Sequence, residues 1–134
     1  MKLTKRTLMG ATLALALTPL AAFAEGSDDP IPGIDVIIER DPSVVPVMNF
    51  TLNDSEMQKF NALKGKERAE FLAGVITRYL LDLGPKAGPD DLRAMLLEGM
   101  GDSWCGPCRM VDGAYVNRIK LPGEGLAVEI KGIV

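Results

Sequence analysis

The chain contains no histidine among its 134 residues. Catalysis by Ser-His-Asp or Cys-His arrangements is therefore excluded, as are metal sites with histidine ligands. Two cysteines alone cannot complete a tetrahedral zinc site within one chain, so neither a metal nor another cofactor is expected. The only strong nucleophile left is a cysteine sulfur.

Clusters of basic residues are also lacking. The chain has 15 Lys and Arg against 18 Asp and Glu, a formal net charge of -3. Residues 1–24 hold three basic and no acidic residues, so without them the charge is -6 (-3 minus 3). Because phosphate neutralisation supplies most of the affinity for nucleic acid, we expect no nucleic-acid partner.

Long apolar runs are scarce, and the clearest one lies near the start of the chain. Three basic residues precede an apolar run at 8–17, and Ala-Phe-Ala follows at 22–24. This order is typical of a bacterial signal peptide, and the run is shorter than the ~20 residues that span a membrane. We predict a cleaved signal peptide over 1–24, a periplasmic or secreted protein, and no membrane association after cleavage. An uncleaved anchor is the alternative.

The remaining residues predict a flexible mature N-terminus at 25–33 and one small globular domain at 34–134. The first segment is polar and rich in turn formers. The second begins with β-branched, apolar stretches at 34–39 and 44–52, which predict two strands.

The middle of the domain has helical patterns. Asn53 and Glu56 are spaced as in a capping box, and apolar residues at three- and four-residue steps follow. We predict helices over 54–64 and 66–83, and a third over 89–100 that starts with proline. The mixed-sign run at 64–70 predicts a solvated helix face.

The last part of the chain allows two interpretations. Apolar residues alternate over 114–121 and 126–131 around the turn residues 122–125, which predicts a β-hairpin. The alternative is a helix over 108–120.

Together these elements predict a small α+β domain with two N-terminal strands, two to three central helices and a C-terminal β-hairpin. The helices would cover one face of an antiparallel sheet. The expected core residues are Phe60, Leu63, Leu72, Val75, Ile76, Leu80, Leu92, Leu96, Val128 and Ile130.

Both cysteines lie in one short motif, Trp104-Cys105-Gly106-Pro107-Cys108. With Arg-Met-Val after it, this motif resembles the active site of the thioredoxin superfamily. The resemblance implies that Cys105 attacks a substrate disulfide and that Cys108 resolves the mixed disulfide. It also implies that Trp104, Gly106 and Pro107 contact the substrate. Such attack needs a thiolate, which a helix N-terminus stabilises.

The resemblance is confined to residues 104–111. A helix end and a glycine turn precede the motif in place of a core strand, and only 26 residues follow Cys108. These are too few for the remaining elements of the family, so a complete thioredoxin fold is not expected.

Two functions remain open. In the first, the dithiol takes part in thiol-disulfide exchange with other exported proteins, as a possible oxidoreductase that forms mixed disulfides. In the second, the Cys105–Cys108 disulfide is structural and the protein is a non-catalytic binding module with Trp104 as the anchor of a recognition loop. A bridge over so short a loop contributes roughly 2 kcal/mol to stability.

Overall fold

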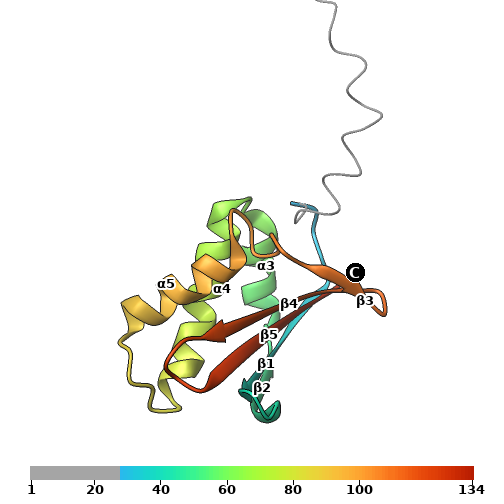
Figure 1. The fold of residues 1–134 in the computed structure, drawn as a ribbon. Helices are drawn as coiled ribbons and strands as arrows, with labels where there is room; N and C mark the ends of the chain where they lie inside the picture. The colour runs from blue at the N-terminus through green and yellow to red at the C-terminus, as the bar shows by residue number, and fades with distance from the viewer. Residues whose placement is uncertain (1–27) are drawn as a thin grey trace, which may run out of the picture.

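The computed structural model describes residues 28–134 (Figure 1). The predicted signal peptide and residues 25–27 lie outside the described residues. The elements are, in chain order, β1 (Gly33–Arg40), β2 (Val45–Thr51), α3 (Asp54–Ala62), α4 (Lys66–Leu81), α5 (Pro89–Met100), β3 (Arg109–Val111), β4 (Ala114–Leu121) and β5 (Leu126–Ile133).

The strands form one antiparallel sheet in the order β2-β1-β5-β4-β3. The last strand, β5, pairs with β1 over its whole length, which joins the C-terminal hairpin to the N-terminal strands. The α+β architecture is therefore confirmed, with the hairpin as predicted. The alternative helix over 108–120 is wrong, because β3 and β4 occupy most of that range. The short strand β3 was not predicted.

The three helices cover one face of the sheet (Figure 1). Alternation along β1 places Ile34, Val36 and Ile38 on this face, and all three are fully buried. Nine of the ten expected core residues are buried as well. The exception is Leu63, which is half-buried because α3 ends one residue before it.

The capping box at the start of α3 is present as predicted. The Asn53 side chain accepts a hydrogen bond from the Glu56 backbone N–H, and the Glu56 carboxylate accepts one from the Asn53 N–H. Helices α3 and α4 are each two residues shorter than expected at the C-terminal end. Between them Gly65 has a φ of 54°, which breaks the helix.

The prediction of a solvated helix face at 64–70 is wrong for Arg68, which is fully buried. Its guanidinium lies 4.5 Å from the centre of the Phe60 ring and donates hydrogen bonds to the carbonyls of Leu63, Asp28 and Asp29. Burial lowers the pKa of Arg68, while the two nearby aspartates act in the opposite direction.

The described part of the segment predicted to be a flexible N-terminus makes further contacts with the helices. The Asn61 side chain both accepts a hydrogen bond from the Ile31 N–H and donates one to the Ile31 carbonyl. The Asp28 carboxylate accepts a hydrogen bond from the Gly65 N–H. The segment before β1 therefore lies along α3 and the start of α4, and Ile31 joins the core.

Candidate functional site

The cysteine motif lies in the loop between α5 and β3. Helix α5 ends at Met100, and Gly101, with a φ of 78°, turns the chain. The Gly106 N–H then donates a hydrogen bond to the Met100 carbonyl, which folds the loop back onto the end of the helix. A Cβ at position 106 would lie 2.6 Å from this carbonyl oxygen, so the close approach requires glycine.

Cys105 and Cys108 form a disulfide across this loop, with their Cα atoms 5.0 Å apart. Their exposure differs, because Cys105 is fully buried whereas Cys108 is only half-buried. The residues between them, Gly106 and Pro107, are exposed. The accessible sulfur is therefore that of Cys108, the reverse of what the thioredoxin resemblance implies.

The position of the disulfide relative to the helices also departs from the thioredoxin arrangement. The motif follows the C-terminal end of α5 and leads into a strand. Carbonyl groups at a helix C-terminus carry partial negative charge, which disfavours a nearby thiolate. Neither Cys105 nor Cys108 lies at a helix start, so the local stabilisation of an attacking thiolate that the resemblance implies is missing.

The indole of Trp104 belongs to the hydrophobic core. It is 2% exposed and meets the Phe60 ring edge-to-face, with ring centres 5.7 Å apart. Its six-membered ring also lies against Gly132 of β5. The side chain of Trp104 is therefore not at the surface in this oxidised form, and its contact with a substrate stays a prediction.

Asn117 is a site residue that sequence analysis missed. It is 3% exposed, and its side-chain amide donates hydrogen bonds to the carbonyls of Gly99 and Trp104. These bonds tie β4 to the end of α5 and to the cysteine loop. A signal was present in the sequence, because Asn117 is the polar residue that interrupts the apolar face of β4.

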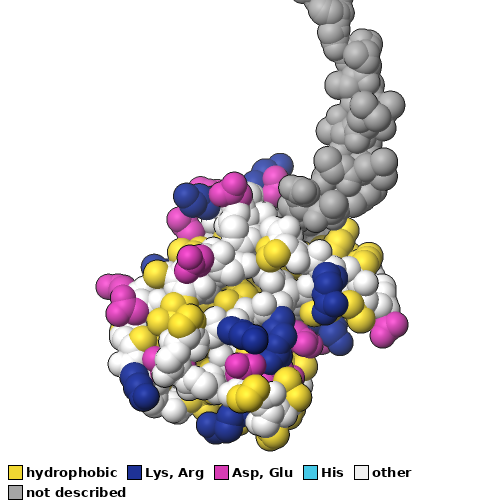
Figure 2. Space-filling model, in the orientation of Figure 1, with side chains coloured by type: hydrophobic (Ala, Val, Ile, Leu, Met, Phe, Trp, Pro, Cys, Tyr) yellow, Lys and Arg dark blue, Asp and Glu magenta, His cyan; other side chains and the backbone are white. Residues whose placement is uncertain are grey.

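Apolar side chains gather beside the loop at one end of the sheet. Met110, Val111, Ile133 and Val134 have 57%, 40%, 37% and 56% of their surface exposed, and we call these four residues the β3-end patch. Val111 pairs with Ala114, which pairs in turn with Ile133, so Val111 and Ile133 share one face of the sheet, whereas the neighbouring Met110 points to the other face. Figure 2 shows apolar side chains on the surface in the region where Figure 1 draws β3.

Within residues 28–134, no group of three or more histidine, cysteine or acidic side chains is arranged to hold a metal ion. None of the helices in that part of the chain is long and apolar enough to cross a membrane. Comparisons with protein-family models, curated proteins and solved structures found no match.

Proposed function

We propose that this protein is an exported, non-catalytic binding module in which the Cys105–Cys108 disulfide is structural. The observation that carries this proposal is the complete burial of Cys105 beside the core residue Trp104. An exchange enzyme needs an exposed sulfur on its attacking cysteine, whereas a structural bridge gains from burial. Export rests on the signal-peptide pattern at 1–24.

The disulfide constrains the loop that leads into β3, a short edge strand with little pairing of its own. Strand β3 has only three residues and pairs with β4 alone. The bridge joins the last residue before β3 to the buried Cys105, which lies directly after Trp104. In the loop-entropy model its stabilisation is about 2 kcal/mol, and its position concentrates that stabilisation on the loop and β3.

The surface that the disulfide supports is the β3-end patch. Strand β3 is an edge of the sheet, so one side of its backbone has no strand partner within the described residues. An exposed edge next to apolar side chains is the arrangement by which sheets take up an extended segment of another protein. The proposed partner is therefore a protein segment that pairs with β3 and packs on Val111 and Ile133.

The binding surface can be tested by crosslinking in the native periplasm or secreted fraction, followed by purification of the crosslinked partner. The variant Val111→Glu should weaken binding of that partner by at least tenfold, as charge at the centre of an apolar contact costs about 1.4 kcal/mol or more. Leu81→Glu changes a comparably exposed apolar residue on α4 and should leave binding unchanged. Equal loss in the two variants would contradict the proposed surface.

Thiol-disulfide exchange through Cys108 is a second candidate, favoured by the partial exposure of this cysteine. A partner thiolate would attack the Cys108 sulfur, the Cys105–Cys108 bond would break, and Cys105 would leave as a thiolate and take a proton from water. A second partner thiol would then attack the mixed disulfide and release Cys108 as a thiol. The partner dithiol is oxidised to a disulfide and this protein is reduced.

Redox titration in glutathione buffers distinguishes the two functions. A structural bridge should have a potential below about -300 mV, and neither single-cysteine variant should accumulate mixed disulfides. Exchange through Cys108 predicts a higher potential and trapped partners in the Cys105→Ser variant, which keeps Cys108. Trapping in Cys108→Ser instead would restore the order that the thioredoxin resemblance implies and contradict the geometry described above.

A further inference from the structure

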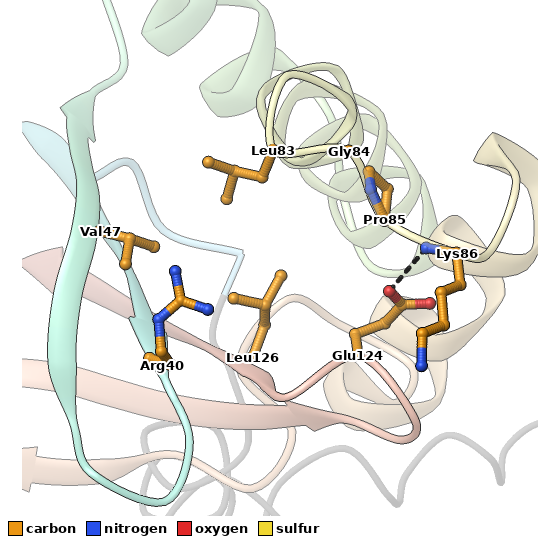
Figure 3. Close-up of a pocket in the computed structure, with 8 residues that line it drawn as sticks. All are labelled: Arg40, Val47, Leu83, Gly84, Pro85, Lys86, Glu124 and Leu126. Carbon is orange, nitrogen blue, oxygen red and sulfur yellow. Dashed lines mark hydrogen bonds between the residues drawn. The ribbon is translucent and has the colours of Figure 1, made fainter.

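A second feature lies at the opposite end of the sheet from the cysteine loop. A cavity of about 230 Å³ opens between the end of β1, strand β2, the loop after α4 and the β4–β5 turn (Figure 3). Because β5 runs from Leu126 at the cavity to Ile133 at the β3-end patch, the two sites are separated by the length of this strand.

Arg40 is an unusual residue for its place in this cavity. Alternation along β1 puts Ile34, Val36 and Ile38 toward the helices, and Arg40 follows at the next position of the same face. It pairs in register with Leu126 of β5. A cation at the end of an apolar column breaks the local pattern, and such departures concentrate at functional positions.

The guanidinium of Arg40 has no hydrogen-bond or ion-pair partner in the part of the chain that the structure describes. The nearby carboxylate of Glu124 is engaged elsewhere. One of its oxygens accepts a hydrogen bond from the backbone N–H of Lys86 at 2.8 Å (Figure 3). The other accepts one from the backbone N–H of Ala87 at 2.9 Å. The Arg40 charge in the cavity is therefore left without a counter-ion.

The Arg40 side chain is exposed to solvent at the cavity, and apolar side chains line the cavity wall near it. Figure 3 shows Val47, Leu83 and Leu126 beside Arg40, on three different elements of the cavity wall. The Lys86 side chain adds a second positive charge to the rim, against the single negative charge of Glu124. The cavity thus combines a net positive charge with an apolar wall.

We propose that this cavity binds a carboxylate that carries a short apolar group. The carboxylate pairs with Arg40, for which the guanidinium offers two parallel N–H donors, and the apolar group packs on Val47, Leu83 and Leu126. The volume is smaller than the roughly 300–1,000 Å³ of drug-sized ligand sites, which limits the group to a short branched chain. A free acid and the last residue of a peptide share this chemistry.

This inference goes beyond the proposed function and does not depend on it. The disulfide and the β3-end patch can be disrupted without touching the cavity. A failure of either proposal therefore leaves the other standing.

The test is an NMR titration of the purified protein with 4-methylpentanoate. A ligand of about eight non-hydrogen atoms should bind with a Kd on the order of 1 mM, and the shifted amides should be those of Val47, Leu83, Lys86 and Leu126. Arg40→Gln should weaken binding about tenfold, because a charge-assisted hydrogen bond is lost. Arg93→Gln removes an exposed cation on α5 that does not line the cavity, and this variant should bind as the wild type does.

Further ligands distinguish a free acid from the C-terminal carboxylate of a peptide, and some of them can refute the proposal. Tight binding of Gly-Gly-Leu but not of its C-terminal amide assigns the site to a peptide end, and binding of 4-methylpentanoate alone assigns it to a free acid. Both results support a carboxylate site. Equal binding of 4-methylpentan-1-ol, stronger binding of inorganic phosphate, unchanged affinity in Arg40→Gln, or no saturable shifts at the cavity would each refute it.

Discussion

Gly132 of β5 lies directly against the indole of Trp104. A Cβ built at Gly132 would be 3.0 Å from Cζ2 of the indole and closer still to Cη2. The indole therefore occupies space on the sheet that any larger residue at position 132 would fill. This contact explains how the tryptophan of a surface loop reaches the core.

The variant Gly132→Ala should be destabilised by about 1–3 kcal/mol, as expected when a close-packed core receives an extra methyl group. Urea denaturation followed by tryptophan fluorescence measures the loss. Gly74→Ala is the matched control, because no atom outside its chain neighbours and the adjacent helix backbone lies within 4 Å of a Cβ there. It lies inside helix α4, where alanine should stabilise by about 0.5–1 kcal/mol. Equal stability of the Gly132→Ala variant and the wild type would contradict the packing described.

Arg68→Met should cost about 3 kcal/mol or more in the free energy of unfolding. The substitution leaves the carbonyls of Leu63, Asp28 and Asp29 without the guanidinium, and hydrogen bonds to a charged group contribute roughly 1.5–3 kcal/mol each. Lys66→Met, an exposed position on the same helix, should change stability by less than about 0.5 kcal/mol.

Hydrogen exchange gives a local readout of the same contacts. The Ile31 amide, which donates to Asn61, should lose protection in Arg68→Met before the amides of β5 do. Unchanged protection at Ile31 would show that the segment before β1 is held by other contacts.

After reduction of the folded protein, iodoacetamide should modify Cys108 before Cys105. The Cys105 side chain is fully buried and reacts only when the loop opens, so its rate should be slower by about tenfold or more. Peptide mass mapping over time measures both rates, and in denaturant they should converge. Faster modification of Cys105 in the folded protein would mean that its burial does not survive reduction.

The ion pairs of Arg118 with Glu39 and Asp41 should stabilise the folded protein by an amount that depends on the salt concentration. The hydrogen bond to Glu39 is the main cause that raises the pKa of Arg118 above its ordinary value. A raised pKa means that this contribution is fully present below the unfolded pKa and is lost only as pH rises through the folded value. Because both values lie far above neutrality, salt is the practical probe.

Arg118→Gln should therefore lower stability by up to about 1 kcal/mol at low salt, and by less at about 1 M salt, where the Debye length is near 3 Å. Lys120→Gln, an exposed residue two positions along β4, serves as the control and should show little loss at either salt concentration. A loss in Arg118→Gln that does not change with salt would assign the effect to packing of its side chain.

Elements whose signals are local could be predicted from the sequence. The capping box at Asn53 and Glu56, the three helices and the C-terminal hairpin follow from spacing and alternation within one segment, and all are present. Strand β3 could not be predicted, since three residues are too few for a pattern and its only partner is β4.

The position of the candidate site in the chain could be predicted from the sequence, but the burial of its residues could not. The cysteine spacing indicated the disulfide, while the burial of Trp104 beside Cys105 depends on Phe60 and Gly132, which are distant from the motif in the chain. Arg68 and Arg40 show the same limit. Arg68 has charged neighbours in the sequence but is buried in the fold. Arg40 follows the apolar residues of β1 and lies at a cavity that four segments of the chain form.

The amino-acid sequence by itself determined the order and type of most elements and the pairing of its two cysteines, because these depend on residues close together in the chain. Only the tertiary structure decided that Trp104 and Cys105 are core residues and that Cys108 is the accessible sulfur. The physical reason is that burial depends on what packs against a residue. The residues that meet at Trp104, Phe60 of α3 and Gly132 of β5, lie 72 positions apart in the chain (132 minus 60).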